Sequence, residues 1–198
     1  PCCLYKGSVP NVKVYKQSLK SIQDTQYMDN LREQFRKGER PKGCQSCWQE
    51  EDAGKISKRQ NSLYKMKNSL TNWTPNSEPT LKFIDFKLGN VCNLKCRICG
   101  SWSSSKWAQE EIDYEKSKGG DNPLARKQLK EGGWPKQYPQ FFEELQEDLK
   151  YVEYFEFTGG EPFMIKDHFK ILMHCVEKGY AKNIDIHYNT NGTQLPPQ

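Results

Sequence analysis

The feature that most constrains this 198-residue chain is a group of three cysteines that directly follows a short apolar segment. Residues 81–86 (LKFIDF) predict a strand, and Cys92, Cys96 and Cys99 follow it with the spacing C-x-x-x-C-x-x-C. Three thiolates this close together can hold one cubane iron-sulfur cluster, each on a different iron, and leave one iron for a small molecule. Structural zinc prefers paired C-x-x-C elements, so the spacing favours iron-sulfur over zinc.

Predicted strands and helices alternate from this point to the end of the chain. Parallel neighbours need a long return connection, so the alternation predicts an α/β fold with parallel strands and crossover helices. A segment punctuated by Gly and Pro interrupts the order at residues 119–139. The predicted strands are residues 81–86, 151–158 and 184–189, and the predicted helices are residues 103–115, 140–149 and 167–178.

Each predicted strand ends in a distinctive short motif. The cysteine group follows the first strand, Gly-Gly-Glu-Pro at residues 159–162 follows the second, and Thr-Asn-Gly at residues 190–192 follows the third. In α/β sheets and barrels, ligands bind at the carboxyl ends of the strands, so we expect the three motifs to share one edge and to form a site there.

In combination, C-N-L-K-C-R-I-C, G-G-E-P and T-N-G resemble the radical S-adenosylmethionine (radical SAM) superfamily. The resemblance implies that the three cysteines hold a [4Fe-4S] cluster whose open iron is chelated by S-adenosylmethionine. It also implies that Gly159, Gly160 and Glu161 bind the amino group of that cofactor, that Pro162 fixes the turn, and that Ile98 packs near the adenine. Many members have an aromatic residue where this chain has Ile98. The residues that close the third strand either line the cofactor pocket or form a tight turn; they are Asn189, Thr190 and Asn191.

The resemblance further implies an oxygen-sensitive enzyme that reductively cleaves S-adenosylmethionine to a 5′-deoxyadenosyl radical for hydrogen abstraction. The electron would come from a low-potential donor such as flavodoxin or ferredoxin, and no catalytic residue is predicted beyond the cofactor ligands. The implied fold is a partial parallel (β/α) barrel with about three of the six usual units. We therefore expect the chain to be part of a longer protein.

A second group of cysteines precedes the predicted strands. Cys3, Cys44 and Cys47 lie in a polar segment that resembles the small auxiliary-cluster modules called twitch or SPASM domains, and they are candidate ligands of a second [4Fe-4S] cluster. Cys2 or a residue before Pro1 would supply a fourth ligand; a zinc knuckle or free buried thiols are the alternatives. We predict this module and a linker at residues 1–79, with one helix at residues 29–37 and no core, and the first half of the radical SAM domain at residues 80–198.

Composition limits the remaining possibilities. Cysteines in clusters indicate metal ligands in a reducing compartment, which predicts a cytoplasmic protein. The net charge of +5 is spread along the chain and no apolar run has membrane-spanning length, so neither a nucleic-acid partner nor a membrane is predicted. Cys175 and the histidines at 168, 174 and 187 lack ligand spacing and are interpreted as core or surface residues.

Two functions from other classes remain open: a non-catalytic zinc- or iron-sulfur-binding module and a ferredoxin-like electron carrier. The zinc module predicts a colourless, air-stable protein. The electron carrier lacks a fourth nearby cysteine and leaves the G-G-E-P motif unexplained. The substrate cannot be read from the sequence, and a peptide substrate is a hypothesis from the resemblance alone.

Overall fold

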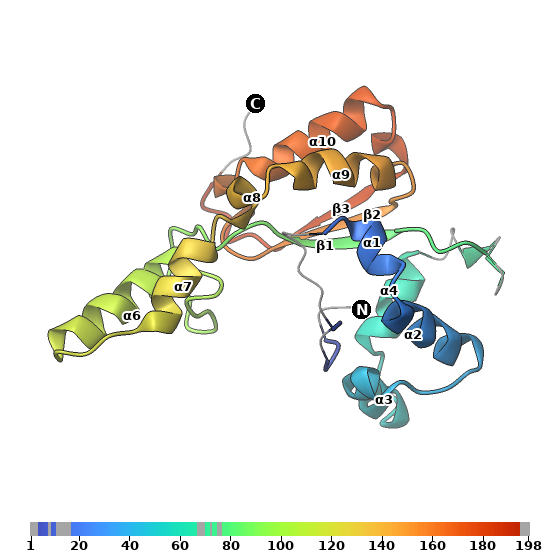
Figure 1. Ribbon diagram of the computed structural model, residues 1–198, viewed down its shortest axis with the longest axis horizontal. Helices are drawn as coiled ribbons and strands as arrows, with labels where there is room; N and C mark the ends of the chain where they lie inside the picture. The colour runs from blue at the N-terminus through green and yellow to red at the C-terminus, as the bar shows by residue number, and fades with distance from the viewer. Residues whose placement is uncertain are drawn as a thin grey trace. The chain divides into compact units, whose positions relative to one another are not determined.

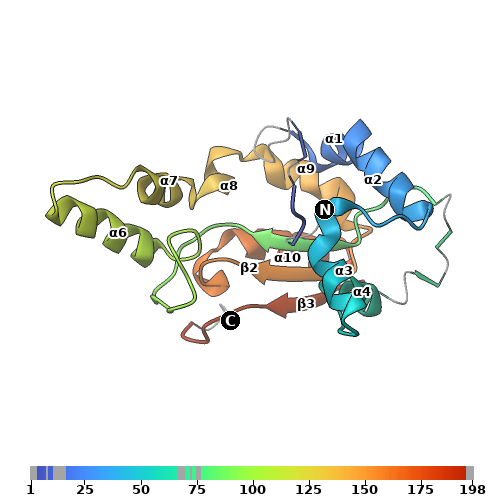
Figure 2. The same cartoon turned by 90° about the horizontal axis from the view of Figure 1, so that it is seen from below.

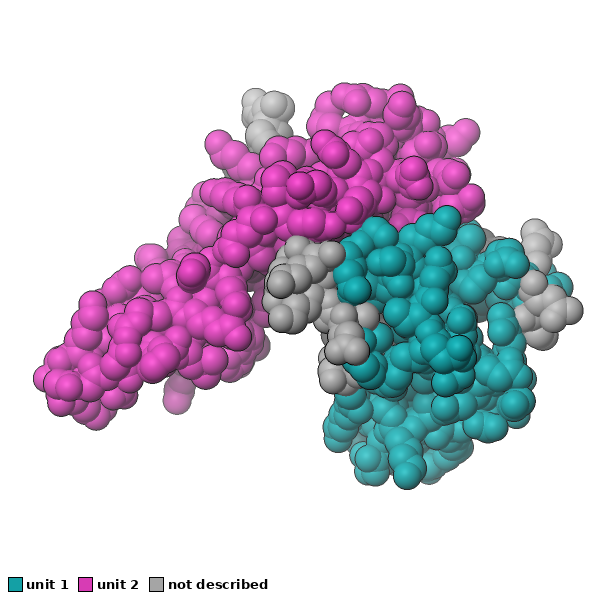
Figure 3. Space-filling view, viewed as in Figure 1, with its two compact units in different colours: residues 1–82 teal, residues 83–198 magenta. Residues whose placement is uncertain are grey.

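The computed structural model of the chain describes residues 4–7, 9–10, 17–66, 70–71, 73–74 and 77–194. It contains two compact units, Pro1–Lys82 and Phe83–Gln198, which Figure 3 shows in separate colours. Part of the linker predicted to precede residue 80 lies outside the described residues. The sequence placed the domain boundary a few residues before the start of the second unit. In the described part of the chain, no helix is both long and apolar enough to cross a membrane.

The second unit is built on a three-stranded parallel sheet. Its strands are β1 (Phe83–Lys87), β2 (Tyr154–Thr158) and β3 (Asp185–Tyr188), in the order β1-β2-β3. The order and the parallel pairing confirm the predicted α/β class. β1 and β2 begin two or three residues later than the apolar pattern suggests, and Val152, just before β2, is buried without joining the ladder. Burial therefore extends further along the chain than strand pairing does.

Aromatic side chains in register hold the three strands together. Phe86, Phe157 and Tyr188 are partners across the sheet, and their rings stack with centroid separations of 5.4 and 5.1 Å. Aromatic cross-strand pairs stabilise a sheet beyond the burial of their area. Phe155 and Phe157 are almost fully buried, each worth about 2 to 3 kcal/mol in apolar area removed from water.

Two amphipathic helices, α9 (Gln140–Leu149) and α10 (Asp167–Glu177), lie side by side over one face of this sheet (Figures 1 and 2). Each helix buries two side chains that are at most 2% exposed: Leu145 and Leu149 in α9, and Ile171 and Cys175 in α10. The burial of Cys175 confirms it as a core residue. His168 of α10 is 1% exposed and packs on Phe157, so it too is a core residue. The short helices that flank α10 are η2 (Pro162–Met164) and η3 (Ala181–Asn183).

The connection from β1 to β2 carries three further helices, α6 (Ser105–Ser117), α7 (Pro123–Glu131) and α8 (Trp134–Gln137). α6 and α7 form a hairpin near the carboxyl end of β1 (Figure 1). The insertion predicted at residues 119–139 is present and contains two helices, because Gly119 follows the end of α6 and Pro123 begins α7. Asn122 caps α7 by accepting a hydrogen bond from the Ala125 amide at 2.9 Å, and Pro123 suits the first helical position.

The first unit is helical. Its helices are α1 (Leu19–Gln23), α2 (Gln26–Arg36), η1 (Lys42–Cys44), α3 (Gln45–Asp52) and α4 (Lys58–Lys65). The prediction of one helix and no core is wrong. Side-chain caps at Ser18, Thr25 and Ser57 start three of the helices. A small core also forms, in which Leu31 and Cys47 are buried.

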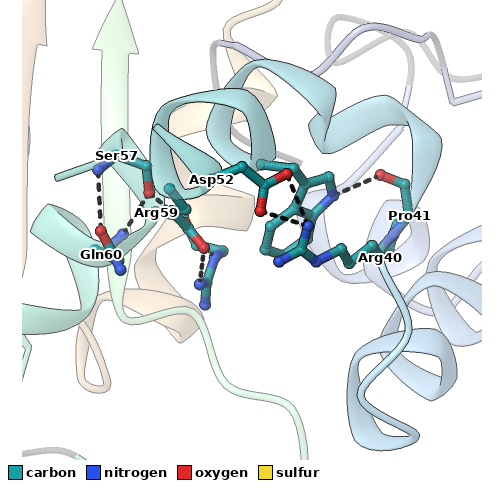
Figure 4. Close-up of polar contacts among 8 residues, drawn as sticks. Arg40, Pro41, Asp52, Ser57, Arg59 and Gln60 are labelled. Atoms are coloured by element: carbon teal, nitrogen blue, oxygen red, sulfur yellow. Dashed lines mark hydrogen bonds and ion pairs between the residues drawn. The ribbon is translucent and has the colours of Figure 1, made fainter. Parts of the chain in front are cut away.

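Polar contacts stabilise this first unit, and Figure 4 shows several of them, including those of Arg40, Pro41 and Arg59. The Trp48 indole N–H donates to the Pro41 carbonyl at 3.0 Å, and the Arg59 guanidinium lies 4.8 Å from the Trp48 ring centroid. Arg59 also donates to both oxygens of Glu51, at 3.0 and 2.6 Å, and this pairing lowers the pKa of Glu51. Such charge-assisted, bidentate contacts fix α3 against the start of α4.

Candidate functional site

The cysteine group lies in the loop between β1 and α6. Cys96 is exposed, and Cys92 and Cys99 are partly exposed. The loop is held by its own polar contacts: the Cys99 amide donates to the Cys96 carbonyl at 3.0 Å, and the indole N–H of Trp107 in α6 donates to the same carbonyl at 3.0 Å. The Ser104 hydroxyl donates to the Leu94 carbonyl at 2.7 Å. The backbone therefore has a defined path around the three thiols.

Asn90 joins the two ends of this loop. It is 3% exposed, and its side-chain Nδ2 donates to the Ser101 carbonyl at 2.9 Å and to the Gln128 carbonyl of α7 at 3.1 Å. Its own carbonyl accepts from the Ser105 amide at 2.7 Å. Because these bonds span both loop ends and the neighbouring hairpin, Asn90 fixes the base from which the cysteines project.

The Gly-Gly-Glu-Pro turn after β2 packs directly on the cysteine loop. The Gly160 amide donates to the Ser103 carbonyl at 3.2 Å, and the Glu161 amide donates to the Val91 carbonyl at 2.7 Å. Gly160 has φ of 59°, and a Cβ there would lie 2.5 Å from the Val91 oxygen. Only glycine combines this left-handed conformation with such a close approach of two backbones.

Glu161 connects this turn to the loop that follows β3. Its carboxylate is fully buried and accepts from the Thr190 hydroxyl at 2.7 Å, the Asn191 amide at 2.7 Å and the Phe163 amide at 3.2 Å. Asn189 stays in the ladder through its amide, which donates to the Phe157 carbonyl at 3.0 Å. The prediction that the three motifs share one edge is confirmed, since hydrogen bonds join each motif to the next.

The three thiols lie close enough for Cys92 and Cys96 to influence the pKa of Cys99. Burial raises the pKa of the Cys99 thiol, and the neighbouring Cys96 and Cys92 raise it further, while Lys87 opposes them. Metal binding requires thiolates, so a bound cluster would supply the positive charge that removes this penalty. Three adjoining thiols on one ordered loop are a donor set that fits an iron-sulfur cluster. In the parts of the chain that the structure describes, no three His, Cys, Asp or Glu side chains are arranged to hold a single metal ion.

The other predicted residues of this site differ in their surroundings. Ile98 is 91% exposed, and Pro162 is buried at the start of η2. Trp102 is 54% exposed, and its ring lies where a Cβ on Gly100 would be. Of the two tryptophans near the cysteines, only Trp107 has an indole bond to the loop backbone. The roles of Ile98, the glycines, Glu161 and residues 189–191 toward a cofactor stay predictions.

Cys44 and Cys47 lie in the first unit, at the start of α3. Cys44 is the residue before the first turn and Cys47 is 3% exposed inside it. Both line a cavity of about 210 Å³ together with Leu4, Tyr5 and Leu31. The third predicted ligand, Cys3, lies outside the described residues.

Sequence reasoning missed Asn90, Ser104 and the contact of Asn191 with the cysteine loop. The signal that could have identified Asn90 is its position: it is a polar residue between Gly89 and the first cysteine, soon after a buried strand. The bond from Ser104 joins residues ten positions apart across a loop, and no local pattern predicts it.

Comparison with known protein families matches residues 86–198 to the Radical SAM superfamily. The match covers more than half of the chain and spans all three motifs, and the chain belongs to this superfamily. Its members cleave S-adenosylmethionine with a [4Fe-4S] cluster. No curated protein and no solved structure matches the chain. The family match includes no residue of the first unit, so the resemblance of that unit to twitch or SPASM modules stays a prediction.

Proposed function

We propose that Cys92, Cys96 and Cys99 hold the [4Fe-4S] cluster and that the chain belongs to an enzyme that abstracts hydrogen from its substrate through a 5′-deoxyadenosyl radical. The observation that carries the proposal is the direct hydrogen bonding of the cysteine loop, the Gly-Gly-Glu-Pro turn and the Thr-Asn-Gly loop at one sheet edge. The zinc module and the ferredoxin-like carrier both leave the last two motifs without a purpose.

When bound, the reduced cluster supplies one electron to the sulfonium of S-adenosylmethionine. The chain's own residues position the reactants. The polar contacts of Asn90, Ser104 and Trp107 hold the cysteine loop, and Gly160 brings the turn against it. We assign Gly159, Gly160 and Glu161 to the side of the site that receives the cofactor's amino group, and Ile98, with its exposed side chain, to the adenine. Pro162 fixes the turn, and residues 189–191 line the same side.

Product analysis after anaerobic reconstitution tests this proposal. With S-adenosylmethionine and a strong reductant, the parent chain is expected to release methionine and 5′-deoxyadenosine, and Cys96→Ala is expected to release neither. Cys175→Ala is the matched control, because that cysteine is buried on α10 and lies outside the cysteine loop. A parent that binds four irons and reduces them but cleaves no S-adenosylmethionine would contradict the proposal.

We also propose that Cys3, Cys44 and Cys47 bind a second [4Fe-4S] cluster. The described residues that follow Cys3 in the sequence lie beside the segment that contains Cys44: the Lys6 amide donates to the Gly43 carbonyl at 2.7 Å, and the Tyr5 ring occupies the space of a Gly43 side chain. Leu4 and Tyr5 line the cavity that Cys44 and Cys47 share. Zinc in place of the cluster is the alternative that metal analysis decides.

The substrate and the electron donor are proposals on the family resemblance alone. We propose a peptide substrate, a low-potential donor such as flavodoxin or ferredoxin, and a cytoplasmic location. Incubation with candidate peptides and deuterated solvent or substrate, followed by mass spectrometry of the peptide and of 5′-deoxyadenosine, tests the first. Failure of every peptide to increase 5′-deoxyadenosine above the substrate-free rate would contradict it.

A further inference from the structure

Asn191 makes a contact that no cofactor-binding role requires. Its side-chain nitrogen Nδ2 lies 3.6 Å from the sulfur of Cys92, within hydrogen-bond distance for sulfur, and 3.0 Å from Oδ1 of Asn93. An amide nitrogen carries two hydrogens, so both acceptors can be served at once. The loop after β3 therefore reaches the first cysteine of the loop after β1.

The hydrogen-bond network fixes which end of the Asn191 amide faces the sulfur. Its Oδ1 accepts from the Thr193 backbone amide at 3.0 Å and from the Thr193 hydroxyl at 2.7 Å. Asn93 closes the ring by donating from Nδ2 to the same hydroxyl oxygen at 2.7 Å. Because a backbone N–H can only donate, a flipped Asn191 amide would set donor against donor at Thr193 and acceptor against acceptor at Asn93.

The position of Asn191 is fixed as firmly as its orientation. Its backbone amide donates to Oε2 of the fully buried Glu161 at 2.7 Å, and the adjacent Thr190 hydroxyl donates to Oε1 at 2.7 Å. A buried carboxylate that accepts three such bonds is costly to displace. Glu161 thus holds the Asn191 amide at the cysteine loop.

We propose that Asn191 is a positioning residue that donates a hydrogen bond to the Cys92 sulfur and thereby raises the reduction potential of the cluster. The proposal rests on the proposed function, in which Cys92 is a cluster ligand. Reduction adds negative charge that spreads onto the ligand sulfurs, and hydrogen bonds to those sulfurs are one of the means by which a protein sets the potential. The Leu94 amide, 3.5 Å from the same sulfur, is a second donor. Cys92 is therefore a ligand whose charge the fold stabilises from two directions.

Redox titration of the reconstituted full chain, followed by electron paramagnetic resonance of the reduced cluster, tests this role. Asn191→Leu removes the donor at similar volume and is expected to make reduction about tenfold less favourable, which is about 59 mV more negative for one electron. Asn93→Ala is the matched control: it removes the other acceptor of the same nitrogen and leaves the sulfur contact, so its potential is expected to equal that of the parent. Equal potentials in the parent and Asn191→Leu would overturn the inference.

Two further measurements separate the possible failures. Iron and sulfide are counted first, and a parent without a cluster would overturn the proposed function together with this inference. A parent with a cluster and unchanged potentials overturns the inference alone. If Asn191→Leu does not take up a cluster, Asn191→Ala removes the same N–H without adding charge, and a potential equal to that of the parent overturns the inference. The parent labelled with ¹⁵N-asparagine is expected to show hyperfine coupling to the reduced cluster that Asn93→Ala retains, and absence of this coupling overturns the inference without any Asn191 variant.

Discussion

The two cysteine groups of this chain differ in how the fold presents them. Cys92, Cys96 and Cys99 lie on a loop without helix or strand, and the carbonyl groups of that loop are bonded to Ser104, Trp107 and the turn after β2. Cys44 and Cys47 lie at the start of a helix, and Cys47 is almost fully buried. Contacts with neighbouring segments fix the backbone of the first group, whereas the helix that contains the second group fixes its backbone.

This difference indicates two kinds of preorganisation. A loop held at both ends by Asn90 can present three thiols to one cluster with little rearrangement. A C-x-x-C at a helix start presents two thiols, so the proposed second cluster needs further ligands from elsewhere; the segment that contains Tyr5 and Lys6 contacts Gly43, next to Cys44. We therefore expect the loop group to bind metal independently and the helix group to depend on the N-terminal segment.

Metal analysis of two multiple variants gives the largest expected effect. Changing Cys92, Cys96 and Cys99 to alanine is expected to abolish the radical-site cluster, about four irons per chain, and with it all cleavage of S-adenosylmethionine. Cys44→Ala with Cys47→Ala is expected to leave those four irons in place. Iron, sulfide and zinc are measured after anaerobic reconstitution.

The parent's total distinguishes the remaining alternatives. About eight irons that fall to about four in either variant indicate two [4Fe-4S] clusters, and about four irons with none in the loop variant restrict iron to the loop. Zinc without sulfide in the parent would contradict the cluster at both groups.

A pair of glycine substitutions compares how tightly each unit is built. Gly160 and Gly54 both have positive φ, 59° and 72°, but a Cβ on Gly160 would strike the Val91 carbonyl, whereas nothing lies within 4 Å of one on Gly54. Gly54→Ala is expected to cost about 1 kcal/mol of unfolding free energy from backbone strain alone. Gly160→Ala is expected to cost about 3 kcal/mol or more, because it also separates the turn from the cysteine loop. Urea unfolding with hydrogen exchange resolved by unit measures both, and equal losses would contradict the tight contact at Gly160.

Much of the second unit follows from local sequence pattern. The strands are apolar runs that end in Gly-Gly-Glu-Pro or Thr-Asn-Gly, and α9 and α10 have clear helical periodicity, so the parallel sheet and the shared edge could be predicted. The first unit could not, because its helices are polar and start at serine and threonine caps that equally suit loops. Periodicity reports burial, and this unit buries few side chains.

The residues of the candidate site likewise fall into those that the sequence predicts and those that it does not. The cysteines and the glycines are recognisable because their chemistry or conformation restricts the residue type. Asn90 and Asn191 act through bonds to residues 11 to 99 positions away, and an asparagine next to a glycine is common in ordinary turns. Such residues are found only when the loops are placed against one another.

Asn90→Ala is expected to have an intermediate effect. It leaves the buried carbonyl of Ser101 and the partly buried carbonyl of Gln128 without their side-chain donor, and the loss of unfolding free energy is expected to be about 2 kcal/mol in the second unit. Since Asn90 lies at the base of the cysteine loop, amide exchange in residues 91–104 is expected to accelerate more than in α10. Uniform acceleration across the unit would show that Asn90 contributes general stability and does not hold the loop in particular.

The smallest expected effect is a pH dependence that belongs to the second unit. Burial lowers the pKa of His168, against the opposing effect of its bond to the Ile165 carbonyl, so the folded state keeps this imidazole neutral. The unfolded chain takes up the proton below about pH 6.5, so the contribution of His168 to stability is lost as the pH falls through that value. His168→Gln can still donate to Ile165 but does not titrate. The unfolding free energy of the second unit, measured between about pH 7.5 and about pH 5.5, is expected to fall less steeply in this variant than in the parent. Equal slopes would contradict the contribution of His168.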